Sequence, residues 1–179
     1  MPQIAPNISL QNDQLTIDGD TINCDDVRAI KFCYEPIRLE FWPIGTKYSF
    51  GFVTEDIHIV TSFKCWLGIN AKRQHARYKE LINGVWDSIV IRLYHELVHL
   101  VEDGHSAPVG PCTITPAGII YSGFLITWDD LSFQVNYNRL TISSKSNPAI
   151  WTNLYYNEVY NVYPLRYFLE WKFRVKEGS

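Results

Sequence analysis

The segment His95–His99, with the sequence HELVH, contains two histidines and a glutamate at a spacing that could bind a metal ion. Residues i and i+4 of a helix share one face, so His95 and His99 could hold one zinc ion. Glu96 lies next to the first histidine and could act as the general base toward a zinc-bound water. These residues would form the centre of a small zinc-dependent hydrolase.

A catalytic zinc site also needs a third protein ligand and an open fourth position. His105 stands ten residues after His95, as in the metzincin-like zinc peptidases. Glu158, in the sequence NEVYN, is similar to the ligand of the gluzincin-like peptidases. Both alternatives stay open at this point, with zinc as the cofactor in either case.

Three departures weaken the zinc hypothesis. The metzincin-like pattern has a glycine where this chain has Glu102, and the nearest glycine, Gly104, comes two residues late. The serine and aspartate that follow the gluzincin glutamate are missing after Glu158. Arg92, one helical turn before the motif, places a positive charge that opposes a cation. The sequence therefore favours a solvent-exposed helix face with no metal and no catalytic residue.

Other catalytic patterns are weaker. The pairs Asp25-Asp26 and Asp129-Asp130 are adjacent residues, which point to opposite sides of a strand, so they predict turns at strand entries. No glycine-rich phosphate loop and no G-x-S-x-G elbow occurs. None of the four cysteines stands in a C-x-x-C pair, so we expect reduced thiols and a cytoplasmic location. They are Cys24, Cys33, Cys65 and Cys112.

Composition excludes several function classes. A net charge of -3 gives no nucleic-acid footprint, and we expect no binding to anionic lipid. The basic cluster of residues 72–79 predicts the solvated first turns of a helix. No apolar run is long enough to span a membrane, and the first twenty residues show no signal peptide. Aromatic residues make up 15% of the chain, and we expect those between positions 151 and 171 to be mainly core.

The first part of the chain, residues 8–67, reads as six or seven short strands with tight turns. The turn signals are QND and DGD, and Glu35-Pro36 separates two apolar runs. Strict alternation predicts that Tyr48, Phe50 and Phe52 share one face of a strand.

A helical period follows over residues 71–103. Asn83-Gly84 could kink this helix, and Gly104 is well placed to end it. The apolar stripe that should pack on a sheet consists of Ile82, Trp86, Ile89, Leu93, Leu97 and Leu100.

The second part repeats this order. Strand-like segments run from residue 112 to residue 156, fewer than a full set of seven, after the connection SAPVG. An amphipathic helix over residues 162–173 closes the chain, with Asn161 as N-cap. The sequences TINCDDVRAI and LITWDDLSFQ align with each other, which predicts an internal duplication.

Strands followed by a covering C-terminal helix resemble the pleckstrin-homology-like (PH-like) fold of small bacterial proteins. The segments GIIYSGFLITWDDLSFQV and YYNEVYNVYPLRYFLEWKF carry this resemblance. It implies an α+β chain of antiparallel barrel or sandwich units, each capped by a helix. The units would be residues 1–104 and a shorter one over residues 105–179.

The resemblance and the incomplete catalytic patterns together predict a non-enzymatic interaction module with a protein partner. The alternative is the zinc hydrolase built on His95, Glu96 and His99. The sequence leaves the oligomeric state open.

Overall fold

The computed structural model describes residues 8–68 and 71–177. Contacts divide the chain into two compact units, Met1–Ile91 and Arg92–Ser179, and each is described by itself. The sequence placed the division after Gly104, whereas the contacts place it inside the helical segment.

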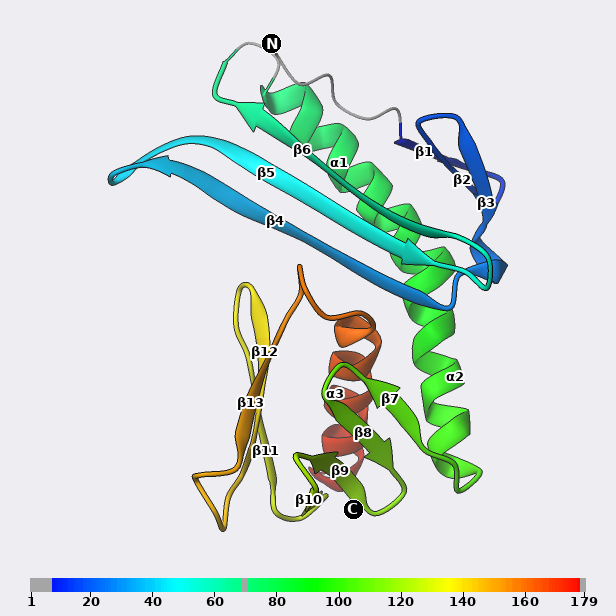
Figure 1. The fold of residues 1–179 in the computed structure, drawn as a ribbon, viewed down its shortest axis with the longest axis vertical. Helices are drawn as coiled ribbons and strands as arrows, with labels where there is room; N and C mark the ends of the chain where they lie inside the picture. Colours follow the sequence, from blue (N-terminus) through cyan, green and yellow to red (C-terminus); the bar gives the residue numbers. More distant parts are fainter. Residues whose placement is uncertain (1–7, 69–70, 178–179) are drawn as a thin grey trace. The chain divides into compact units, whose positions relative to one another are not determined.

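Unit 1 consists of two three-stranded antiparallel sheets and a helix (Figure 1). The strand order is β1-β2-β3 in the first sheet and β4-β5-β6 in the second. The elements are β1 (Ile8–Gln11), β2 (Gln14–Ile17), β3 (Asp20–Asn23), a short 3₁₀ turn (Cys24–Asp26), β4 (Ala29–Leu39), β5 (Trp42–Val53), β6 (His58–Trp66) and α1 (Ala71–Val85).

The hairpins of the first sheet form at the predicted turn signals. Asn12 and Asp13 both have positive φ, as do Asp18 and Gly19, which is the backbone of a two-residue type I′ turn. Asparagine, aspartate and glycine tolerate this left-handed conformation, so each turn holds two strands at a fixed register.

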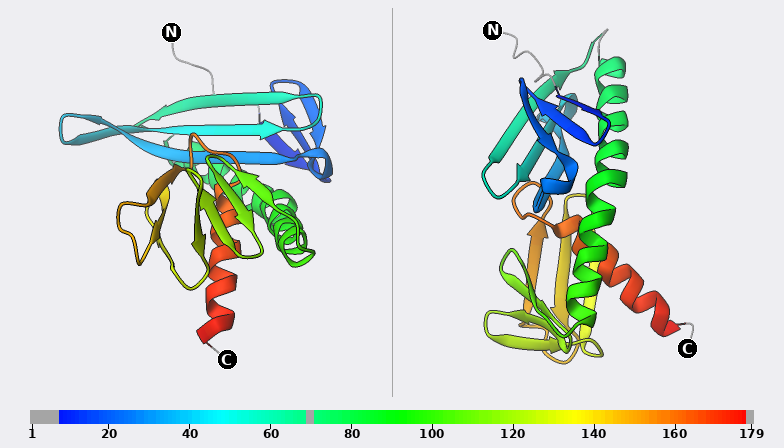
Figure 2. Two further views of the ribbon diagram at one scale, coloured as in Figure 1. Left: turned by 60° about the horizontal axis from the view of Figure 1, so that its bottom comes forward. Right: turned by 90° about the vertical axis from the view of Figure 1, so that its right-hand side faces the viewer.

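The second sheet packs on α1 through aromatic side chains (Figure 2). Tyr48, Phe50 and Phe52 are buried on one face of β5, as the alternation predicted. Tyr78 of α1 lies 4.1 Å from the Tyr48 ring and 5.3 Å from the Phe50 ring, measured between centroids. The ring of Phe63 on β6 is tilted relative to the Tyr48 ring, and the two ring centroids are 5.0 Å apart. Such ring pairs contribute about 0.5–1.5 kcal/mol each beyond their buried area.

The prediction that Glu35-Pro36 ends a strand is wrong. β4 continues through Pro36 and pairs with β5 as far as Leu39, opposite Trp42. β4 is an edge strand of its sheet, so the missing N–H of proline costs no hydrogen bond when it faces away from β5. The result is one long hairpin whose turn is formed by Glu40 and Phe41.

The helical segment continues past Gly84 without a break. A π-helical segment, η2 (Trp86–Val90), joins α1 to α2 (Ile91–Glu102). A π turn holds more residues than an α turn, so the residues after it are rotated about the helix axis and a different set of them faces the core. The predicted stripe is therefore wrong at its end: Leu100 is 42% exposed, whereas Val98 and Val101 are buried.

The end of α2 is correctly predicted. Gly104 adopts φ +86°, a left-handed conformation that suits glycine. The backbone N–H of His105 donates to the carbonyl of Leu100 at 2.9 Å, which satisfies one of the last helical acceptors.

Unit 2 contains α2, two antiparallel sheets and α3. The strand order is β10-β9-β8-β7 in one sheet and β11-β12-β13 in the other. The elements are β7 (Ala107–Val109), β8 (Cys112–Thr115), β9 (Gly118–Tyr121), β10 (Phe124–Thr127), β11 (Leu131–Val135), β12 (Arg139–Ser144), β13 (Trp151–Tyr155) and α3 (Val162–Glu177).

These seven strands exceed the number that the sequence indicated. The extra strand is β7, which forms from the segment SAPVG that was expected to be a connection. Pro108 is tolerated there because β7 is an edge strand. α3 begins after Asn161, whose carbonyl accepts from the N–H of Leu165 at 3.1 Å. Leu165, Phe168 and Leu169 on α3 are fully buried.

The first sheets of the two units match at a constant offset in numbering. β1, β2 and β3 correspond residue by residue to β8, β9 and β10. The turn Asp18-Gly19 corresponds to Ser122-Gly123, and all four residues have positive φ. The fold class is thus α+β with antiparallel sheets, and among the described residues these sheets do not close into a barrel.

Candidate functional site

The HELVH segment lies on α2, and its three candidate residues point to solvent. His95, Glu96 and His99 are exposed. The guanidinium of Arg92 forms a salt bridge with the carboxylate of Glu96 one turn away. The Glu96 carboxylate, which would have to act as the general base, is therefore paired with the positive charge of Arg92.

The two possible third ligands are also at the surface. His105 is exposed just after the turn at Gly104, and Glu158 is exposed in the turn before α3. Within residues 8–68 and 71–177, no three His, Cys, Asp or Glu side chains are grouped so that they could hold a metal ion. Two of the three ligands that a zinc site needs, His95 and His99, therefore lie on one helix face, and no third ligand among the described residues is grouped with them.

The paired acids lie in turns, and one of them has a structural role. Asp130 accepts hydrogen bonds from the hydroxyl of Ser144 at 2.5 Å and from the N–H of Ser146 at 2.7 Å. These bonds hold the pKa of Asp130 below its ordinary value. The carboxylate ties the turn before β11 to the loop after β12. Asp26, at the corresponding position of unit 1, is exposed.

All four cysteines are buried, and none of them forms a disulfide bond in residues 8–68 and 71–177. Burial raises the pKa of Cys33 and of Cys112 to about 11, so these thiols stay protonated at neutral pH. A protonated, buried thiol is a poor nucleophile, which gives the cysteines a packing role.

The basic cluster covers the exposed side of α1, with one side chain anchored. His75 Nδ1 and Tyr48 Oη form a hydrogen bond at 2.8 Å, which fixes the start of α1 on the sheet. Lys72, Arg73 and Lys79 are exposed.

The strongest surface feature was not predicted. Five large apolar side chains are exposed where β4 turns into β5 and where β6 ends, and we call them the aromatic tip. Phe41 is 92% and Trp42 76% exposed, and the other three are more than half exposed. The members of the aromatic tip are Leu39, Phe41, Trp42, Trp66 and Leu67.

Backbone pairing brings these residues together. Leu39 pairs with Trp42 across the hairpin. The N–H of Leu67 donates to the carbonyl of Ile44 at 2.9 Å, which holds the end of β6 beside the start of β5. A Cβ on Gly45 would lie 2.5 Å from the carbonyl oxygen of Cys65, so glycine permits this close approach.

A signal for the aromatic tip was present in the sequence. The run Leu39-Glu40-Phe41-Trp42-Pro43 places apolar residues around a turn, where polar residues are the rule. The prediction of a break at Glu35-Pro36 obscured this signal, because it placed the end of the strand before Leu39. Trp151 on β13 is a second exposed aromatic residue, at 53%, so the aromatic residues of positions 151–171 are not all core.

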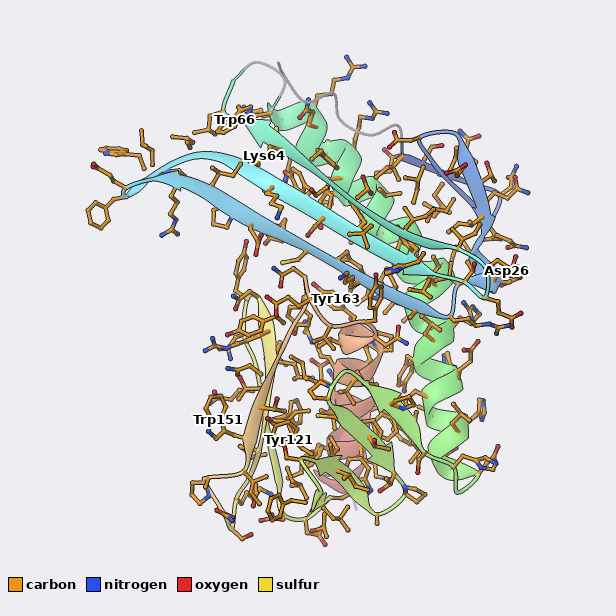
Figure 3. The ribbon with its side chains drawn as sticks, in the orientation of Figure 1. Asp26, Lys64, Trp66, Tyr121, Trp151 and Tyr163 are labelled. Atoms are coloured by element: carbon orange, nitrogen blue, oxygen red, sulfur yellow. The ribbon has the colours of Figure 1, made fainter. Side chains whose placement is uncertain are left out.

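Charged side chains of both signs lie at both ends of the sheet β4-β5-β6. Arg38, Glu40 and Lys64 are exposed near the aromatic tip. At the other end, Asp26, Glu55 and Asp56 line a polar pocket of about 300 Å³ together with Arg28, which forms a salt bridge with Glu55. Figure 3 shows Trp66 and Lys64 toward one end of this sheet and Asp26 at the other.

Comparisons of this chain with models of known protein families, with curated protein sequences and with solved structures gave no match. Among the described helices, none combines the length and the apolar character needed to cross a membrane.

Proposed function

We propose that this chain is a non-enzymatic interaction module that binds a protein partner through the aromatic tip. The observation that carries the proposal is the exposure of five large apolar side chains at the turn between β4 and β5 and at the adjoining end of β6. Contiguous exposed apolar patches on soluble proteins mark interaction sites, because water contact with them is unfavourable. Tryptophan and phenylalanine are also the side chains that contribute most to binding at interfaces.

A protein partner fits the aromatic tip better than an anionic bilayer does. Glu40 lies at the turn of the hairpin between Leu39 and Phe41, and it is exposed. Insertion of the turn into lipid would carry this carboxylate toward anionic headgroups and into a medium where charge is costly. A protein surface with an apolar pocket and mixed charges can accept the aromatic residues, Glu40 and Arg38 together.

We further infer that the two units are PH-like and arose by duplication. The ordered sequence of strands and a following helix supports the PH-like assignment of each unit. The residue-by-residue match of the first sheets supports duplication, since insertion or deletion would break a constant offset. Burial agrees as well: Leu15 and Ile22 correspond to Ile119 and Ile126, and all four are buried.

The test is site-specific photocrosslinking in cells of the native host. A photoreactive residue at position 41 should capture a distinct protein, and Trp42→Ser in the same chain should abolish the capture. The matched control carries the photoreactive residue at position 137, because Tyr137 is also an exposed aromatic residue at a hairpin turn, in unit 2.

Three results would overturn the proposal. They are equal capture from positions 41 and 137, capture of no protein at all, and sedimentation of the chain with anionic liposomes that requires Trp42. Capture of a second copy of the chain would identify the partner as the chain itself, and the concentration dependence of its mass in solution would then have to agree.

A further inference from the structure

A second binding surface lies at the free edge of β1 in unit 1. Among the described residues β1 pairs with β2 alone, so its other edge carries no strand. Ile8 and Leu10 are only half-buried, although both are apolar. A sheet edge with unpaired backbone groups can accept another strand.

Unit 2 shows what occupies the corresponding edge there. Ile8 and Leu10 correspond to Cys112 and Ile114 of β8, which are 1% and 0% exposed. These two are covered because β7 pairs with β8, with Val109 opposite Cys112 and Ala107 opposite Ile114. The same fold thus accepts an extended segment at this edge.

The backbone of β1 is oriented for such pairing. The two-residue turn Asn12-Asp13 makes the flanking pair Gln11 and Gln14 the hydrogen-bonded one. Alternation along the ladder then directs the N–H and C=O groups of Leu10 and Ile8 away from β2. In β8, the corresponding residues face β7.

A groove between β1 and α1 would receive the side chains of the added strand. Its volume is about 360 Å³. The helix contributes Arg77, Glu80, Leu81 and Gly84, which recur at helical spacing and form one face of α1. The strand contributes the segment Ile8–Gln11. The lining combines the apolar residues Ile8, Leu10 and Leu81 with side chains of both charges, Arg77 and Glu80, which suits a peptide better than a small ion.

We propose that the β1 edge and the α1 groove bind an extended segment of a partner protein as an added antiparallel strand. By analogy with β7, the segment carries small apolar residues opposite Leu10 and Ile8 and a free choice of residue between them. In the register of β7, the chain's own residues before β1 would place Ala5 opposite Ile8 but the polar Gln3 opposite Leu10, so they match this pattern at one of its two positions. This surface is separate from the aromatic tip, so its test is independent of the proposed function above.

The probe is a labelled synthetic peptide with the sequence of residues 105–111, HSAPVGP, added to the full chain. Saturating peptide should slow amide exchange of Ile8 and Leu10 by at least about tenfold, because their N–H groups become bonded. Ser9 should change little, because its N–H already faces β2. A peptide with aspartate at the positions of Ala107 and Val109 should bind at least about tenfold more weakly, because it would bury charge.

Matched variants assign the effect to the groove. Leu81→Glu should weaken peptide binding by at least about tenfold, whereas Lys79→Glu, on an exposed part of α1, should change it by less than about twofold. Thermal melting of both variants checks that they remain folded. Two results would overturn the proposal: no change at Ile8 and Leu10 up to the solubility limit of the peptide, or binding that appears only after residues 1–7 are deleted. The second result would mean that the chain fills its own groove.

Discussion

From β1 in unit 1 and from β8 in unit 2, the two units share the order of six strands and a helix, but they differ in how many of their apolar and backbone groups are covered. In unit 2, β7 covers the edge of β8, Asp130 ties two loops together, and the hairpin of β11 and β12 is short. In unit 1, β1 has no strand on its outer edge among residues 8–68 and 71–177, Asp26 is exposed, and the hairpin of β4 and β5 is long and ends in the aromatic tip.

Under the proposal that unit 1 binds the partner, this difference separates stability from binding within one chain. Unit 2 keeps the interactions needed for its own stability, while unit 1 exposes apolar and backbone groups. Exposed groups of this kind reduce solubility and favour aggregation, so they persist where a partner covers them. If unit 1 binds the partner as proposed, variants placed in unit 1 and in unit 2 should affect binding and stability differently.

The largest effects should come from the core of each unit. Phe50→Ala in unit 1 and Phe168→Ala in unit 2 each remove a fully buried ring. We expect each to lower the free energy of unfolding by about 3–5 kcal/mol. Native-state hydrogen exchange should show the larger loss of protection in the mutated unit. Equal losses in both units would contradict the division into two units.

A smaller effect should distinguish corresponding positions in the first sheets. A Cβ on Gly118 would lie 2.1 Å from the carbonyl oxygen of Ile126, so Gly118→Ala forces β9 and β10 apart. We expect a loss of about 1–3 kcal/mol, since overpacked sites typically cost that much. Gln14 is the corresponding residue of unit 1 and is exposed, so Gln14→Ala should stay within about 0.5 kcal/mol. Denaturant unfolding of both variants is the measurement, and equal effects would contradict the residue-by-residue correspondence.

Asp26 and Asp130, which follow β3 and β10, should differ in their effect on the melting temperature. Asp130→Asn should lower the melting temperature at neutral pH, because the amide presents an NH₂ group to one of two donors. Asp26→Asn should leave it nearly unchanged. The folded-state pKa of Asp130 is lowered, so its stabilisation is present above the ordinary carboxyl pKa of 3.8 and is lost as the pH falls below it. The difference between wild type and Asp130→Asn should therefore shrink in acid, and a difference that grows in acid would contradict this role.

Local chemistry made much of this comparison predictable from sequence. Turn residues with positive φ located the hairpins of the first sheets, and strict alternation identified the buried face of β5. Gly104 marked the end of α2. Each of these features depends on residues close together in the chain.

The features that depend on pairing were missed. Whether Pro36 ends a strand depends on whether its N–H faces a neighbour, and only the sheet order decides that. β7 is three residues long and exists because β8 offers an edge. The aromatic tip was missed for the same reason, since its location follows from the length of the hairpin. The π segment before α2 shifted the buried face in a way that a regular period does not describe.

The aromatic tip should affect binding far more than stability. The double variant Phe41→Ser and Trp42→Ser should change the free energy of unfolding by no more than about 0.5 kcal/mol, because both side chains are exposed. The same variant should lose the crosslinked partner. Trp151→Ser removes an exposed tryptophan from unit 2 and should keep the partner. A loss of several kcal/mol in the free energy of unfolding of the double variant would show that the aromatic tip is packed in solution. The exposed tip would then no longer distinguish unit 1 from unit 2.

The smallest effect is expected at the HELVH segment of unit 2. His95→Ala and His99→Ala should each stay within about 0.5 kcal/mol of wild type, because both side chains are exposed. Metal analysis of chain purified without a histidine tag should give zinc well below one ion per chain. A bound zinc would behave differently, because metal binding stabilises the folded state and losing a ligand removes that stabilisation. Stoichiometric zinc that disappears in both variants would assign catalysis to unit 2. His105→Ala and Glu158→Ala would then identify the third ligand, and Arg92→Ala would show whether freeing Glu96 from its salt bridge raises hydrolysis.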